Sequence, residues 1–282
     1  MKTGLVLEGG GMRGLFSAGV MDVMMETGIR FDGIIGVSAG AAFGVNYKSG
    51  QRGRALRYNV DYCQDKRYCG IRSLLKTGNL FNTEFCYDEI PLKLDVFDFD
   101  AFERDPTAFY ITCTDVESGK PVYHEYCGRK DHGFDWIGAS ASLPVVSQIV
   151  EIDGLKLLDG GIADSIPVAY FERIGYTKNV VILTQPQGYR KEKNQLLPLI
   201  RVKYRHYPNL VKALEVRHLM YNAELDLIQE QEKRGDLFVI RPHSSLPVKR
   251  MEKDPAKLKT CYEMGRQAAE TARERLLAFL KK

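Results

Sequence analysis

Short apolar runs alternate with longer amphipathic segments along the first part of the chain. Residues 4–8 and 33–37 are apolar runs that indicate buried strands, and helical patterns over 15–26 and 39–48 follow them. A strand–helix–strand–helix order is typical of a parallel sheet with helices on its faces. The pattern therefore predicts an α/β fold with a mostly parallel central sheet.

The rest of the chain continues the same alternation and then becomes helical. Residues 108–115 and 121–126 are strand-like and are joined by the turn sequence ESGK, which predicts a hairpin. Further strands are expected at 155–158, 180–184 and 237–240. Long helices are expected over 211–234, where Gly235 is a natural stop, and from Asp254-Pro255 onward.

Residues 185–209, where Pro, Gly and basic residues cluster, are the expected seam between two parts of the chain. We expect a core over 1–185, followed over 186–282 by a basic connector and a C-terminal helical region packed on that core. Residues 50–106 contain many aromatic and charged side chains. Their pattern fits either a lid or a simple helical layer.

The composition is that of a globular protein. Of 282 residues, 44% are hydrophobic and 27% are charged, and no run of about 18 apolar residues predicts a membrane span. The first residues do not resemble a secretory signal. The six cysteines are scattered without metal-ligand spacing, so free thiols and a cytoplasmic location are expected.

Positive charge is modest overall but concentrated in one segment. The net charge of +4 is too small to favour a nucleic-acid partner. Residues 186–212 nevertheless contain seven Lys or Arg and a single acid, Glu192, interleaved with Tyr and Leu. This segment is either a solvated connector or a surface for peripheral contact with anionic lipid.

A glycine run follows the first expected strand. Gly9-Gly10-Gly11-Met12-Arg13-Gly14 fits G-x-G-x-x-G and could bring backbone amides to an anion at a helix start. A dinucleotide site would need an acid at the end of the second strand, whereas Asp32 precedes that strand. A P-loop would need G-K-[ST], which is absent. An oxyanion hole and a plain glycine turn remain open.

A serine elbow follows the second expected strand. Gly36-Val37-Ser38-Ala39-Gly40 fits G-x-S-x-G between a strand and a helix, the context that a nucleophilic serine requires. Each motif follows one of two neighbouring parallel strands, so the two motifs should lie together at one edge of the sheet. Amides of Gly10, Gly11 and Met12 could then stabilise an oxyanion while Ser38 attacks, with Arg13 as a charged neighbour.

A third motif could supply the base. Leu157-Leu158-Asp159-Gly160-Gly161 places an acid at the end of another apolar strand. Asp159 could reach the same sheet edge and accept the Ser38 proton, although an Asx turn after a strand is the commoner use of such a residue.

These motifs together resemble the patatin-like phospholipase family. The resemblance rests on GGGMRG, on GVSAG about 27 residues later, on the DGG of 159–161 and on SASLP at 140–144. It covers roughly residues 4–185 and implies a three-layer α/β/α fold with patatin-like topology. It also implies a serine-dependent lipid acyl hydrolase of the phospholipase A or lysophospholipase type, needing no cofactor or metal.

The resemblance implies a role for each matched position. Ser38 would be the nucleophile and Asp159 the proton acceptor of a Ser-Asp dyad. The residues implied as the oxyanion hole are Gly9, Gly10, Gly11, Met12, Arg13 and Gly14. Small residues are implied at Gly36 and Gly40 in the elbow and at Gly160 and Gly161 after the base.

The five histidines fit this chemistry poorly. A Ser-Asp-His triad would need a histidine after Asp159, and only His206, His218 and His243 qualify. His243 follows the strand-like 237–240 and is the best placed, but we expect no histidine to transfer the proton. Two alternatives stay open: an anion- or nucleotide-binding module, and a thioesterase or small-ester hydrolase.

Overall fold

The computed structural model describes residues 1–281, and an eight-stranded sheet forms its centre. The strands are β1 (Lys2–Leu7), β2 (Gly33–Val37), β3 (Ala108–Asp115), β4 (Pro121–Glu125), β5 (Val150–Ile152), β6 (Leu155–Asp159), β7 (Tyr176–Ile182) and β8 (Leu237–Ile240). They follow the order β5–β6–β3–β2–β1–β7–β8, with β4 paired to β3 beside this path.

Pairing in the middle of the sheet is parallel. β1 pairs in parallel with β2 and β7, β2 with β3, and β7 with β8. β4 and β6 are antiparallel to β3, and β5 is antiparallel to β6. Because β1 and β2 are parallel neighbours, the segments that follow them leave the sheet at the same edge, as the two motifs require.

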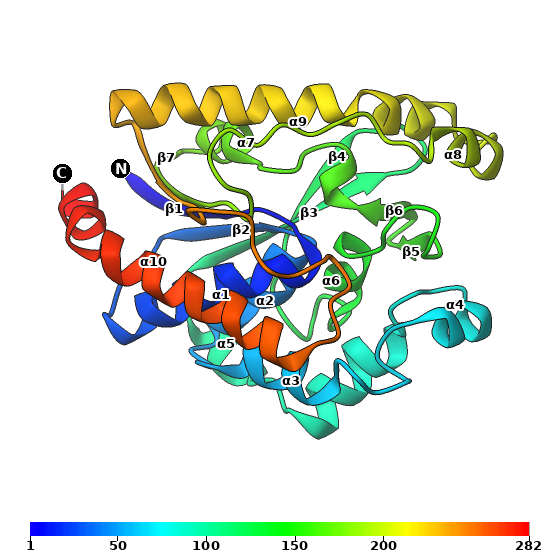
Figure 1. Cartoon of the computed structure of the whole chain (residues 1–282), viewed down its shortest axis with the longest axis horizontal. Coiled ribbons are helices and arrows are strands. Elements are labelled where there is room, and N and C mark those ends of the chain that lie inside the picture. Colours follow the sequence, from blue (N-terminus) through cyan, green and yellow to red (C-terminus); the bar gives the residue numbers. More distant parts are fainter. Residues whose placement is uncertain (282) are drawn as a thin grey trace.

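Helices cover both faces of this sheet. The α-helices are α1 (Gly14–Glu26), α2 (Ala39–Lys48), α3 (Arg54–Tyr62), α4 (Ile71–Thr77), α5 (Phe99–Arg104), α6 (Asp135–Ser140), α7 (Val168–Arg173), α8 (Leu197–Lys203), α9 (Pro208–Arg234) and α10 (Pro255–Lys281). Shorter helical turns are η1 (Gly11–Arg13) and η3 (Gly160–Ile162), and η2 (Phe85–Leu94) is a π-helical segment. In Figure 1, α7 and α9 lie over one face of the sheet, and α1, α2 and α10 lie over the other. The predicted three-layer α/β/α fold is confirmed.

Successive side chains of β1 point to opposite faces of the sheet and contribute to two separate parts of the core. Leu5 and Leu7 belong to the apolar cluster under α1, α2 and α10, whereas Val6 belongs to the cluster under α7 and α9. All three are fully buried. A strand buried on both faces explains why β1 is apolar throughout instead of alternating with polar residues.

The connector and the helices after it pack onto the core. Within residues 186–212, Leu197, Ile200, Tyr204 and Leu210 are buried together with residues from β6 and η3. α10 packs along α1, where the Tyr262 hydroxyl donates a hydrogen bond of 2.5 Å to Asp22. Residues 50–106 form α3, α4, η2 and α5.

Several predicted boundaries shift in the structure. β7 covers Tyr176–Ile182 instead of 180–184, because its first residues pair with the start of β1 and its last predicted residue, Thr184, turns toward Glu8. The short strand β5 and the helix α8 were not predicted. α9 begins at Pro208, three residues earlier than expected, and a proline is well tolerated at a first helical turn.

Among residues 1–281, no helix has the length and apolarity needed to cross a membrane.

Candidate active site

Ser38 occupies the sharp turn between β2 and α2. Its φ of 54° is a conformation that residues other than glycine rarely adopt. Its amide donates a 2.8 Å hydrogen bond to Ser140 Oγ, and the Ser140 hydroxyl in turn donates to the Thr112 carbonyl at 2.7 Å. This relay fixes the strained turn, so Ser140 of the SASLP segment is a positioning residue for the elbow.

The elbow also depends on a close approach of two backbones. A Cβ added at Gly40 would lie 2.4 Å from the Leu7 carbonyl oxygen, and one added at Gly36 would lie 2.5 Å from the Ala41 amide nitrogen. Neither distance is tolerable for a carbon atom. The predicted requirement for small residues at both positions therefore has a direct steric cause.

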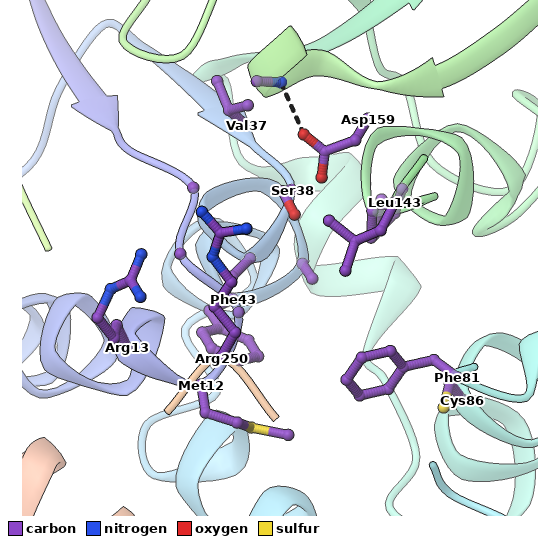
Figure 2. Close-up of a pocket in the computed structure, with 18 of the residues that line it drawn as sticks. Met12, Arg13, Val37, Ser38, Phe43, Phe81, Cys86, Leu143, Asp159 and Arg250 are labelled. Atoms are coloured by element: carbon purple, nitrogen blue, oxygen red, sulfur yellow. Dashed lines mark hydrogen bonds between the residues drawn. The ribbon is translucent and has the colours of Figure 1, made fainter. Parts of the chain in front are cut away.

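Asp159 ends β6 and lies buried at the same end of the cavity as Ser38. Figure 2 shows the Ser38 hydroxyl beside the Asp159 carboxylate. Carboxylate Oδ1 accepts the Gly161 amide at 2.8 Å, the dashed line in the figure. The Asp159 carbonyl oxygen accepts the Thr114 hydroxyl at 2.9 Å, so both ends of the residue are held.

The surroundings of Asp159 change its acidity. Burial raises the pKa of the carboxyl group above its ordinary value, while the Arg217 guanidinium, the Ser38 hydroxyl and the Gly161 amide lower it. Burial is the largest of these effects. A carboxylate with a raised pKa is a stronger base, which partly closes the gap between an ordinary Asp and a serine hydroxyl.

The glycine loop faces the elbow, and some of its backbone amides make no hydrogen bond to the protein. No acceptor within residues 1–281 takes the amides of Gly9, Gly10 and Gly11. By contrast, the Met12 amide donates to the Arg250 carbonyl at 3.1 Å, and the Arg13 amide donates to the Gly10 carbonyl at 3.3 Å. The Met12 amide, which was expected to serve the oxyanion hole, is therefore already bonded in this structure.

The later residues of the loop are anchors. The Gly14 amide is taken by the carbonyls of Gly11 and Met12 as α1 begins. Just before the loop, Glu8 accepts the Thr184 amide at 2.6 Å and the Tyr221 hydroxyl at 2.6 Å. The start of the loop is thus held by Thr184, just after β7, and by Tyr221 on α9, and its end is held by Arg250 and the first turn of α1. Gly9–Gly11 remain as the segment whose amides are available.

A cavity of about 140 Å³ joins these groups. Ser38, Asp159 and the glycine loop line one part of it. Its apolar wall comes from α3, η2, α6 and the segments around them, including Tyr58, Phe81, Tyr87, Ile90 and Leu143. Cavities of about 150 Å³ accept a molecule the size of benzene, so this one can hold an ester and the first carbons of a chain.

No histidine within residues 1–281 lines this cavity. His243 is exposed, and His206 accepts a hydrogen bond from its neighbour Arg205. His124 is bonded to Asp131 and stacks on Trp136 at 3.8 Å between ring centroids, and His132 is bonded to Asp153 at 3.0 Å. His218 lies on α9 outside the lining.

Besides Arg54 on α3, three cationic residues of the cavity were not predicted as site residues. Lys191 lies in the connector, Arg217 on α9 and Arg250 in the loop before α10. Arg217 Nε donates to the Gly161 carbonyl beside the Asp159 carboxylate. The sequence around Lys191 gave one indication of a role, the basic composition of its segment. Nothing in the sequence near Arg217 or Arg250 distinguishes them from other polar helix and loop residues.

Comparison with family models gives two matches. Residues 5–172 match the model described as patatin-like phospholipase. Residues 207–281 match a domain of unknown function, DUF6363. The first match contains Ser38, Asp159 and the glycine loop, whereas Lys191, Arg217 and Arg250 all lie beyond it.

Curated relatives align with about two thirds of this chain or somewhat less. The uncharacterised protein YjjU of Escherichia coli K12 is 32% identical over 193 residues, which cover 66% of this chain and 52% of that protein. An uncharacterised NTE family protein of Mycobacterium tuberculosis H37Rv is 29% identical, covering 60% of this chain and 45% of its own. Lysophospholipase nte1 of Aspergillus terreus is 29% identical, covering 62% of this chain and 11% of its own. The chain thus spans about half the length, or less, of these relatives.

Among solved structures, VipD from Legionella pneumophila is similar with a TM-score of 0.45 at 11% identity. The match covers 96% of this chain and 67% of that one.

Proposed function

Since the chain belongs to the patatin-like phospholipase family, we propose that it hydrolyses carboxylic ester bonds of lipids, with Ser38 as nucleophile and Asp159 as base. One observation carries the proposal. A serine in a strained turn, a buried carboxylate and three free backbone amides share a single cavity with an apolar wall.

The first half of the reaction forms an acyl-enzyme. Ser38 Oγ attacks the carbonyl carbon of the ester while Asp159 takes the hydroxyl proton. The amides of Gly9–Gly11 donate to the oxyanion, and each such donor contributes about 3–4 kcal/mol to the barrier reduction in known cases. When the tetrahedral intermediate collapses, the bond to the alcohol breaks and Asp159 returns the proton to the leaving oxygen.

The second half regenerates the serine. A water molecule gives its proton to Asp159 and attacks the acyl carbonyl, and the oxyanion uses the same amides. Collapse releases the fatty acid, and Ser38 Oγ recovers the proton from Asp159. The aromatic wall around Tyr58, Phe81 and Tyr87 suits the first carbons of an acyl chain, which favours a lipid ester over a small polar one.

A fluorophosphonate probe tests this proposal. The wild-type protein is expected to form a covalent adduct at Ser38, located by mass spectrometry, because only an activated serine reacts with such a reagent. Ser38→Ala should remain unlabelled, while Ser118→Ala, which removes an exposed serine, should be labelled like the wild type. An unlabelled but folded wild type would favour the alternative of an anion-binding module.

Substrates separate the remaining alternatives. The purified protein is expected to cleave long-chain oxygen esters presented as monomers or micelles more efficiently than acetate esters or acyl thioesters. A clear preference for acyl thioesters or for acetate esters would replace the lipid assignment with the thioesterase or small-ester alternative.

We further propose that residues 186–212 contact a lipid surface peripherally. Leu196, Leu199 and Val202 on or beside α8 are 54%, 50% and 69% exposed, next to the exposed cations Lys193, Arg201, Lys203 and Arg205. Apolar side chains flanked by cations are typical of helices that lie in an anionic membrane interface.

Vesicle co-sedimentation tests the surface. Leu199→Gln with Val202→Gln should weaken binding to anionic vesicles by about tenfold, because burying one such side chain contributes roughly 1.5 kcal/mol or more. Leu219→Gln, at a 60% exposed position on α9, is the control and should bind like the wild type. Equal binding to neutral and anionic vesicles, or none to either, would contradict the proposal and leave 186–212 as a solvated connector.

A further inference from the structure

Four cationic side chains line the cavity close to Ser38 and Asp159. They are Arg13, Lys191, Arg217 and Arg250, and they come from η1, the connector, α9 and the loop before α10. Segments far apart in the sequence thus bring positive charge to one place. Figure 2 shows the guanidinium groups of Arg13 and Arg250 on the glycine-loop side of the site.

None of the four forms an ion pair within residues 1–281. The Nε atom of Arg13 is buried and has no hydrogen-bond partner there. Arg54 on the same cavity contrasts with them, since it pairs with Asp95 at 3.3 Å. Arg13, Lys191 and Arg217 are partly buried, and Arg250 is exposed at the mouth of the group. Cations that are withdrawn from water are normally paired in folded proteins, so an unpaired cluster around one cavity indicates a place for an anion.

The two carboxylates that line the cavity are already engaged. Glu8 accepts hydrogen bonds from Thr184 and Tyr221, and Asp159 accepts one from Gly161 and is the proposed base. Neither is within 4.0 Å of a cation of this cluster, the distance that defines the ion pairs. An added negative charge would therefore meet free donors and would not have to displace an existing partner.

The position of Lys191 is fixed rather than accidental. Its backbone amide and carbonyl are both bonded to the Asn222 side chain on α9, at 2.8 and 3.1 Å. Its Nζ lies 4.2 Å from the centre of the Tyr221 ring. Burial, followed by the neighbouring Arg217, Arg250 and Arg13, lowers the pKa of Lys191 to about 7, and Glu8 opposes this shift. These charges repel one another in the absence of an anion.

We propose that Arg13, Lys191, Arg217 and Arg250 form a subsite for the phosphate group of an acyl ester and select anionic headgroups over zwitterionic or neutral ones. The inference rests on the proposed function, because it places the headgroup beside the ester that Ser38 attacks. Guanidinium and ammonium donors are the side chains that proteins use to bind phosphate oxygens.

The preference for a net negative headgroup follows from what the cluster lacks. A quaternary ammonium is bound by carboxylates or by open aromatic faces. Here the carboxylates are engaged, and Lys191 already covers the Tyr221 ring. A phosphate monoester or phosphoglycerol group would be attracted by every member of the cluster, whereas phosphocholine would bring a cation against four others.

The test compares three esters that share one acyl chain, supplied below their micellar concentrations. They are lysophosphatidic acid, lysophosphatidylcholine and a monoacylglycerol. For each protein, kcat/KM for lysophosphatidic acid is divided by kcat/KM for each of the other two. Lys191→Gln with Arg250→Gln should lower both ratios by at least about tenfold, or about 1.4 kcal/mol.

The control removes the same charge from a surface that has no proposed role. Lys233→Gln with Lys259→Gln neutralises two exposed cations outside both the cavity and residues 186–212, and its ratios should equal those of the wild type. Equal losses on all three esters in the Lys191/Arg250 variant, or unchanged ratios, would overturn the proposal while leaving ester hydrolysis intact.

A second measurement does not depend on hydrolysis. Ser38→Ala protein is titrated with glycerol 3-phosphate, inorganic phosphate and glycerol in a calorimeter. Glycerol 3-phosphate should bind, glycerol should not, and the Lys191/Arg250 replacements should weaken the binding by at least about tenfold, or about 1.4 kcal/mol. If Ser38→Ala binds glycerol 3-phosphate but the wild-type protein cleaves no ester, the result contradicts the proposed function and leaves the phosphate-binding cluster in place. If inorganic phosphate binds but the kcat/KM ratios of the Lys191/Arg250 variant equal those of the wild type, the cations bind a free anion and the proposed headgroup subsite is overturned.

Discussion

Replacing Ser38 with alanine is expected to lower kcat/KM for lipid-ester hydrolysis by about 10⁴-fold or more, comparable with known losses of a nucleophilic serine. Asp159→Asn should come close to this loss, because the amide keeps an oxygen for the Gly161 bond of 2.8 Å but cannot accept a proton as the carboxylate does. The double variant should be no worse than the single ones, since the two side chains act in one step.

Folding is monitored in the same samples by circular dichroism and thermal melting. Both variants should keep the wild-type spectrum, because neither adds volume at a buried position. A double variant much less active than either single one, with each single one retaining strong activity, would contradict the dyad.

The activity is expected to depend on pH through the ionisation of Asp159. Asp159 must be ionised to accept the proton, and burial raises its pKa above the ordinary value. kcat/KM should therefore fall as the pH drops through this raised pKa and level off above it. The acidic limb should persist in His243→Ala, because it reports a carboxyl group and not an imidazole.

Histidine variants are the matched control for the dyad. His206→Ala, His218→Ala and His243→Ala should each keep kcat/KM within about tenfold of the wild type, or about 1.4 kcal/mol of barrier. None of the three side chains lines the cavity. A thousandfold loss in a folded histidine variant would replace the dyad with a triad.

Gly11→Ala is expected to reduce kcat by about 10²-fold or more, the effect of losing an oxyanion donor. Gly11 has a φ of +58°, and a Cβ there would lie 2.5 Å from the Arg250 carbonyl oxygen. That carbonyl is the acceptor of the Met12 amide, so the loop cannot yield without breaking the bond that anchors it. The amides of Gly9–Gly11 should then miss the oxyanion.

Gly28→Ala separates this effect from backbone strain. Gly28 has a similar φ of +68° but no atom within 4 Å of an added Cβ. Gly28→Ala should lose about 1–2 kcal/mol of unfolding free energy, the cost of the left-handed conformation, and Gly11→Ala should lose at least as much because it also clashes with the Arg250 carbonyl. Only Gly11→Ala should lose kcat, and equal kcat values for the two variants would exclude Gly11 from the oxyanion hole.

Local signals in the chain were sufficient for the elbow and for the pairing of the first two strands. The strand 33–37 and the helix 39–48 match β2 and α2 residue for residue, because an apolar run and a small-residue turn leave few alternatives at these positions. The pairing of β1 with β2 followed from the strand–helix–strand order. These features depend on residues that are near one another in the sequence.

Other features depend on residues that are far apart. The Met12 amide faces the Arg250 carbonyl, 238 positions later, and no pattern around Gly9–Gly14 announces this partner. Likewise, Arg217 reaches Gly161 only because α9 crosses the end of β6. β5 has three residues, too few for a periodic signal, and it is visible only through its pairing with β6.

The family match ends at residue 172, but β1 needs β7, which begins at Tyr176. A fragment ending at 172 would retain Ser38, Asp159 and the whole glycine loop. It would also leave one side of β1 without a strand partner and Glu8 without Thr184 and Tyr221. A bare apolar edge of this kind recruits strands from other molecules, which leads to aggregation. The segment that carries the motifs therefore ends before the segment that completes the sheet around them.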